Sequence, residues 1–134
     1  MYKVIKINRH MATTFIDVLN LDTQTIDGCF DDSAVVSDEN FDFMEEGELY
    51  NCKIELFGDF DREPTEKSVV IRILADDVLI GDQTSLKVAI GDDIYYIPKS
   101  AAEGFEIRET MLFHYTRKDL IQVNDTVHAD CFYD

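Results

Sequence analysis

Apolar and polar residues alternate along much of this chain, and an alternation with a period of two is typical of β-strands that bury one face. The clearest example is the segment 49–57. Its apolar face carries Tyr50, Cys52, Ile54 and Leu56. The opposite face carries Asn51, Lys53, Glu55 and Phe57, so the sequence predicts one aromatic side chain on the outward side of this strand.

Similar short runs predict further strands, and polar turn residues separate them. They lie at residues 2–7, 13–21, 25–30, 69–74, 78–80, 86–90, 94–97, 106–115 and 126–133. The strongest turn signal is Gly91-Asp92-Asp93, which predicts a hairpin between two of these strands. Helix signals are few. Ser37 is placed to cap a short helix over residues 41–46, and residues 100–103 fit a single helical turn.

Many short strands without a long helix between them predict a mainly β fold, either a small antiparallel barrel or a sandwich, with one or two short helical turns. Residues 43–50, an apolar pair followed by an acidic turn and a strand, resemble the turn that introduces a strand in oligonucleotide-binding barrels, which implies an OB-like barrel. Residues 120–127 repeat this pattern, by internal duplication or by coincidence. The length predicts a single all-β domain over residues 1–134.

The charge is strongly acidic and unevenly distributed. The 134 residues include 12 Lys and Arg against 28 Asp and Glu, a net charge of −16. Residues 27–66 alone hold 14 acids and 2 bases, so they carry −12 of this charge, while the first ten residues hold three bases and no acid. Such an asymmetry can attract a basic partner, or it can simply keep the protein in solution.

We therefore expect a non-enzymatic binding module that turns the acidic region 27–66 towards a basic protein partner, as an inhibitor or immunity-type protein does. Aromatic residues rimmed by carboxylates suit such a surface, because the rings supply affinity and the charges set the association rate. The alternative is that these aromatic residues complete the core. The predicted binding residues are Phe41, Phe43, Glu45, Glu46, Asp59, Phe60, Asp61 and Glu63.

Several classes of partner and place are not expected. Nucleic-acid binding needs basic residues facing phosphates, and the bases Lys3, Lys6 and Arg9 instead fit a solvated edge strand. No apolar run approaches the roughly 20 residues that cross a bilayer, no leader is visible, and three widely spaced cysteines favour a cytoplasmic protein. The sequence suggests no cofactor. Self-association through edge strands remains open.

A second reading is a small-ligand-binding barrel, or an enzyme, with its site at the barrel mouth. Glu55 or Asp17 could line such a barrel as an acid with a raised pKa. No motif assigns a catalytic residue or a metal site. Whether the acidic loops or the three histidines, His10, His114 and His128, bind a metal is open, and one possibility is that His114 and His128 face each other.

Overall fold

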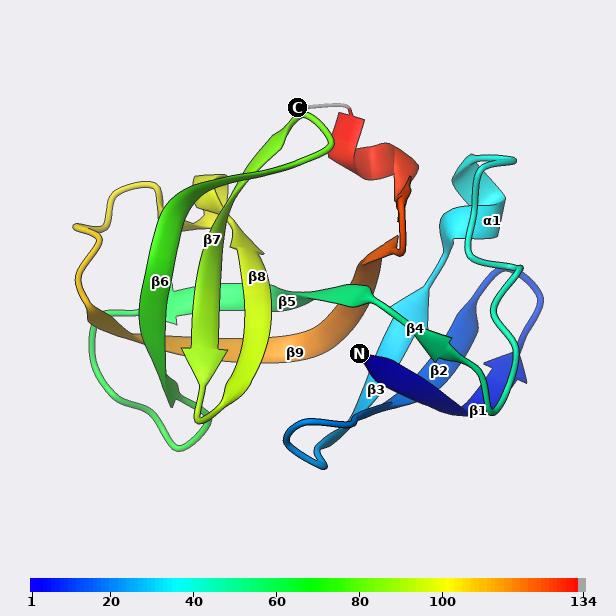
Figure 1. The fold of residues 1–134 in the computed structure, drawn as a ribbon. Helices are drawn as coiled ribbons and strands as arrows, with labels where there is room; N and C mark the ends of the chain where they lie inside the picture. Colours follow the sequence, from blue (N-terminus) through cyan, green and yellow to red (C-terminus); the bar gives the residue numbers. More distant parts are fainter. Residues whose placement is uncertain (133–134) are drawn as a thin grey trace.

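The computed structural model describes residues 1–132, whose strands join into one continuous sheet (Figure 1). An antiparallel meander is formed by β1 (Tyr2–Arg9), β2 (Thr14–Asn20) and β3 (Ile26–Asp31), and β4 (Leu49–Tyr50) pairs with β1. The remaining strands are β5 (Cys52–Asp61), β6 (Val69–Ile80), β7 (Gln83–Ile90), β8 (Asp93–Pro98), β9 (Thr110–Val123) and β10 (Thr126–Val127).

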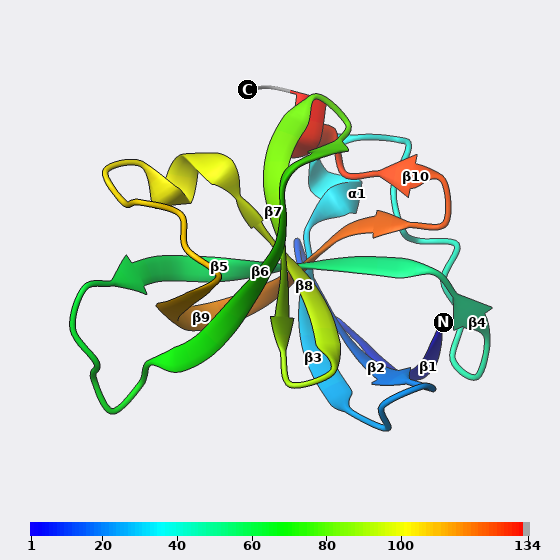
Figure 2. The same ribbon diagram turned by 60° about the vertical axis from the view of Figure 1, so that its left-hand side comes forward.

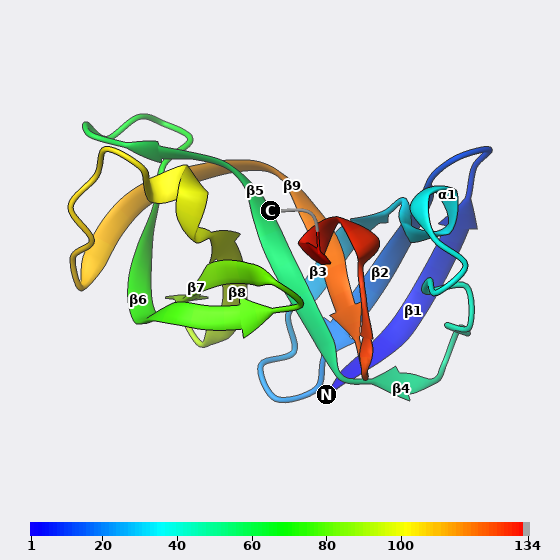
Figure 3. The same ribbon diagram turned by 90° about the horizontal axis from the view of Figure 1, so that it is seen from above.

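Five of these strands close into a barrel in the order β5-β9-β6-β7-β8. All neighbours in the barrel are antiparallel except β5 and β8. The predicted mainly β fold is thus confirmed, and the barrel is found rather than the sandwich. Seen from above, β5 and β9 belong to the barrel and also reach towards the meander, where β3 pairs with β9 (Figure 3).

Within residues 1–132, three short helices lie at the turns: α1 (Ser33–Val36) and the 3-10 helices η1 (Lys99–Ala102) and η2 (Ala129–Phe132). None of the helices within the described residues has the length or the apolar character needed to cross a bilayer.

The alternating pattern places the core where the sequence predicts it. Ile54 and Leu56 of β5 are buried, and they pack in the same hydrophobic cluster as Ile16 and Val18 of the meander. The predicted hairpin at Gly91 is also present, with β7 and β8 paired from Ile90 to Asp93 around it. Gly91 has a φ of +60° there, a conformation that glycine adopts without strain.

Three sequence predictions about elements are wrong. Residues 75–77 do not form a turn, because β6 runs through them with register shifts against β7. The predicted helix over 41–46 is a chain of turns, held by a hydrogen bond from the Phe41 N–H to Ser33 Oγ (3.0 Å), and the helix lies earlier, in α1.

The third concerns the end of the chain. β9 continues beyond Tyr115 to Val123, and the predicted strand 126–133 is a two-residue strand followed by η2. Tyr133, which the sequence places on the apolar face of that strand, lies outside the described residues.

A buried polar contact joins the meander to the barrel. Asp27 of β3 is 2% exposed, and its carboxylate accepts hydrogen bonds from Lys118 Nζ of β9 (2.6 Å) and from the Tyr95 hydroxyl of β8 (2.8 Å). Burial lowers the pKa of Lys118, but the hydrogen bond and the charge of Asp27 outweigh it and hold that pKa above its ordinary value. Burial and the same carboxylate raise the pKa of Tyr95.

Replacing Lys118 with methionine is expected to lower the free energy of unfolding by about 3–5 kcal/mol, because it leaves the Asp27 charge buried without a cation. The double variant Asp27→Asn/Lys118→Met should recover most of this loss, since the neutral amide oxygen still accepts the Tyr95 hydrogen bond. Urea unfolding followed by circular dichroism measures both. A loss in Lys118→Met below about 1 kcal/mol, the size typical of an exposed pair, would contradict this role.

Candidate functional site

The predicted binding phenylalanines divide between core and surface. Phe41 is buried and lies edge-on against the His128 ring, with ring centroids 6.2 Å apart. Phe60 is buried as well. Phe43 is 44% exposed and packs edge-on against Tyr50. Of these three phenylalanines only Phe43 offers a ring to a partner, and Phe41 and Phe60 follow the alternative that they complete the core.

Acidic residues of the loop before β4 contact the first strand. Glu46 Oε1 accepts the Ile7 N–H of β1 (2.9 Å), and Asp42 pairs with Arg9 of β1 (3.3 Å). Glu45 is exposed beside them. Part of the acidic region is therefore matched by the basic strand of the same chain, and the loop covers part of the β1 edge, in the manner by which proteins protect sheet edges.

The remaining predicted acids lie at the far end of β5. Asp61 accepts hydrogen bonds from Ser68 Oγ (2.6 Å) and His114 Nδ1 (2.8 Å), and these contacts hold the pKa of its carboxyl below the ordinary range. Asp59 is exposed, with its carboxylate 3.7 Å from His114 Nε2. Glu63 is exposed in the loop that follows.

The structure does not bring the eight predicted residues into one surface. Figure 2 shows β5 crossing the molecule, from β4 at one end to the loop that leads into β6 at the other. Phe41, Phe43, Glu45 and Glu46 precede this strand, whereas the other four lie at or after its end. Any common partner would have to span the length of β5.

A different set of aromatic residues gathers on the outward face of the sheet. Phe15 of β2 packs edge-on against Phe30 of β3, with centroids 5.7 Å apart. The Arg117 guanidinium of β9 lies 4.3 Å from the Phe30 ring and 4.6 Å from the Phe57 ring of β5, and it pairs with Asp119. We call Phe15, Phe30, Phe57 and Arg117 the aromatic stripe. Sequence reasoning found only Phe57, although Phe15 also occupies an outward position in its strand.

Carboxylates surround a small cavity beside this stripe. The cavity has a volume of about 80 Å³, and Phe30 and Arg117 border it. We call its acids, Asp32, Glu55, Asp119 and Asp130, the carboxylate pocket. Burial raises the pKa of Glu55, and a hydrogen bond from Gln83 Nε2 (3.0 Å) offsets part of that rise. Within residues 1–132, only Asp119 of these four acids pairs with a lysine or arginine.

Asp32, His128 and Asp130 stand close enough together to be considered as metal ligands. The Asp130 N–H donates to His128 Nδ1 (3.0 Å), so the ring proton lies on Nε2 and donates to Asp32 (2.6 Å). A metal on Nε2 would force that proton to Nδ1, against the Asp130 N–H. The geometry therefore fits a hydrogen-bonded link from η2 to the start of α1 better than a metal site. His114 of β9 contacts Asp61 of β5 and does not face His128.

The aromatic stripe and the carboxylate pocket together place exposed rings beside three carboxylates, Asp32, Glu55 and Asp130, that pair with no lysine or arginine within residues 1–132. This combination suits noncovalent recognition, in which rings supply buried apolar area and carboxylates supply electrostatic complementarity. Comparison of the chain with protein families, with curated proteins and with solved structures found no match.

Glu55→Gln is expected to stabilise the protein at pH 7, because it removes a charge that burial disfavours while its amide oxygen can still accept from Gln83. A carboxyl whose pKa is raised in the folded state stabilises the protein most when the pH is below its ordinary pKa of 4.5. This contribution to stability is lost as the pH rises through the folded-state pKa. The advantage of the variant should therefore vanish below that pH.

Urea unfolding at several pH values measures this difference. Glu109→Gln, which alters an exposed carboxylate of the loop before β9, is the control and should change stability little at any pH. A Glu55→Gln variant that is less stable than the wild type at pH 7 would show that the Glu55 charge is favourable where it lies.

Proposed function

We propose that this protein is a non-enzymatic binding module whose aromatic stripe and carboxylate pocket dock a basic, partly apolar segment of a partner protein. The observation that carries the proposal is the alignment of Phe15, Phe30 and Phe57, from three strands, across one outward face beside the carboxylate pocket. An exposed ring is ordinary by itself, but a contiguous row of rings is typical of an interaction site.

The stripe has the features of a binding surface that is formed before the partner arrives. Phe15 is 45% exposed and Phe57 is 52% exposed, so both rings have area left to bury. Arg117 is held between Phe30 and Phe57 by two ring contacts and by Asp119, which fixes the rings without covering them completely. Ordered side chains lose little conformational freedom on binding, which favours affinity.

The charge around the stripe favours a basic partner. Asp32, Glu55 and Asp130 pair with no lysine or arginine among the described residues, and their hydrogen bonds come from His128 and Gln83, so a cation that reaches them need not displace a lysine or arginine. The cavity of about 80 Å³ between them can hold the end of one lysine side chain, since a water molecule takes about 30 Å³ in the liquid. The net charge of −16 would attract a basic partner over longer distances.

The test uses a short peptide in which lysine alternates with leucine, titrated into the ¹⁵N-labelled protein. We expect saturable shifts of the amides of the aromatic stripe, with affinity that falls as salt is added. Phe57→Ser and Phe15→Ser should each weaken binding by about tenfold, the effect typical of a central aromatic contact. Asp130→Asn should weaken it less and reduce its salt dependence.

Matched control variants distinguish binding at the aromatic stripe from nonspecific binding elsewhere on the protein. Leu79→Ser removes an apolar side chain of β6 that is 66% exposed and lies outside the stripe, and Asp77→Asn removes an exposed acid of the same strand. Both should bind as the wild type does. A peptide with glutamate in place of lysine should not bind. Equal losses in Leu79→Ser and Phe57→Ser, or shifts spread over the whole molecule, would overturn the proposal.

A further inference from the structure

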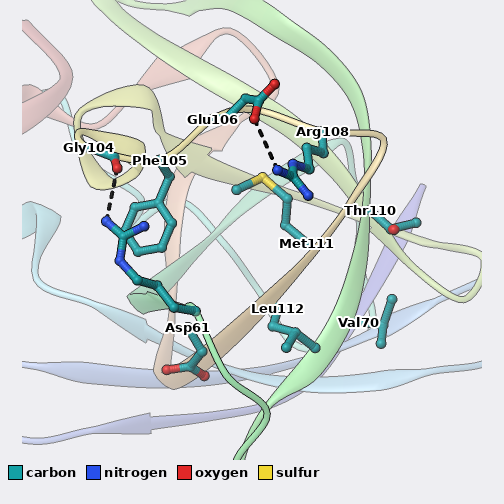
Figure 4. A pocket seen from close by; sticks show the side chains of 10 residues that line it. Asp61, Val70, Gly104, Phe105, Glu106, Arg108, Thr110, Met111 and Leu112 are labelled. Atoms are coloured by element: carbon teal, nitrogen blue, oxygen red, sulfur yellow. Dashed lines mark hydrogen bonds and ion pairs between the residues drawn. The ribbon is translucent and has the colours of Figure 1, made fainter.

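A second and larger cavity lies at the end of the barrel where β5 stops and β9 begins (Figure 4). Its volume is about 640 Å³, within the range of 300–1,000 Å³ usual for small-molecule sites. The loop after η1 forms one wall, and the first residues of β9 form another. None of its lining residues belongs to the aromatic stripe or to the carboxylate pocket.

The cavity has an apolar side that is fixed by the core. Phe105 packs against the buried Phe60, with ring centroids 5.7 Å apart, so the core holds the Phe105 ring in place. Met111 and Leu112 of β9 are partly buried beside it, and Val70 of β6 is 61% exposed at the margin. These side chains offer apolar surface for a ligand without any rearrangement of the barrel.

Arg62 is the cation of this cavity that lacks a carboxylate partner. Its guanidinium lies 4.3 Å from the Phe105 ring centroid and donates one N–H to the Gly104 carbonyl (2.9 Å). It makes no ion pair within the described residues, although the chain has 28 acids. Since a guanidinium has five N–H donors, Arg62 keeps donors for an anion, and it is already oriented by the ring and the carbonyl.

The other charges around the cavity are already paired. Arg108 lies 3.1 Å from Glu106 Oε2, and Asp61 is engaged by Ser68 and His114. The lining thus holds two arginines and two carboxylates, and Arg62 is its cation without an ion pair among the described residues, while the two carboxylates would repel a second negative charge on a ligand. This balance suits an anion with a single charge better than a phosphate dianion.

We infer that this cavity binds a small organic monocarboxylate with an aromatic or branched apolar body. The carboxylate accepts hydrogen bonds from Arg62, and the body packs against Phe105, Met111 and Leu112. The inference goes beyond the proposed protein-binding function, because it concerns a different surface, a ligand of opposite charge and no residue of the aromatic stripe.

The test uses 3-phenylpropionate as the probe, titrated into the ¹⁵N-labelled protein. Saturable shifts confined to the amides of Phe105, Met111, Leu112 and their neighbours are expected. Arg62→Gln should weaken binding tenfold or more, since charge-assisted hydrogen bonds to a carboxylate are lost. Arg9→Gln, which alters an exposed arginine of β1 away from the barrel end, is the matched control and should leave binding unchanged.

A pair of variants at Val70 tests, independently of Arg62, whether the ligand that binds in the cavity is negatively charged. Because this side chain is exposed, both Val70→Glu and Val70→Lys should fold, but only Val70→Glu should abolish binding. The uncharged amide of the probe and phenyl phosphate should both bind more weakly than the carboxylate. Equal binding of the amide, unchanged binding in Arg62→Gln, or no saturable shift at the cavity with aryl or branched alkyl carboxylates would each overturn the inference.

Discussion

The contact between Asp27, Lys118 and Tyr95 is the constraint on which the arrangement of meander and barrel depends. It joins β3, β9 and β8 at a point where the carboxylate is almost completely buried. A buried ion pair adds little net stability over apolar residues of the same size, but it strongly penalises any state in which one partner is lost. A slip of β9 by one residue would move Lys118 to the other face of the sheet. We infer that the contact fixes the register of β9 against β3 more than it adds to stability.

Elements that depend on neighbouring residues could be predicted from the sequence, whereas those that depend on distant contacts could not. The strand at residues 49–57 and the hairpin at Gly91 are recorded in neighbouring residues, so a local pattern suffices to predict them. The continuation of β9 through its charged residues cannot be predicted from a local pattern, because the acid that neutralises Lys118 lies 91 positions away. The acids at 76–77 likewise look like a turn, but they lie in a register shift of β6 between Ala75 and Val78, which both pair with β7.

The candidate site was hidden for a related reason. Acidic residues are concentrated in residues 27–66 of the sequence, but β5 separates them in space along its length. Arg9 of β1 and His114 contact some of these acids. The aromatic stripe depends on the sheet order β2-β3-β9-β5, which interleaves strands that are far apart in sequence. The stripe takes its residues one from each of these strands, and no sequence spacing connects them. Phe57 could be placed on an outward face from the sequence, but its neighbours could not be named.

The two surfaces differ in how charge acts on them, although the same strands, β5 and β9, contribute to both. A basic partner is attracted by the net charge over distances up to a Debye length of about 8 Å, so added salt should slow its association. An organic acid approaches the same protein against that field and gains attraction only at contact with Arg62. Added salt screens the repulsion as well as the contact, so acid binding at the barrel end should depend on salt less steeply than partner binding at the stripe. In these two proposals, the sign of the ligand's charge therefore distinguishes the aromatic stripe from the cavity at the barrel end.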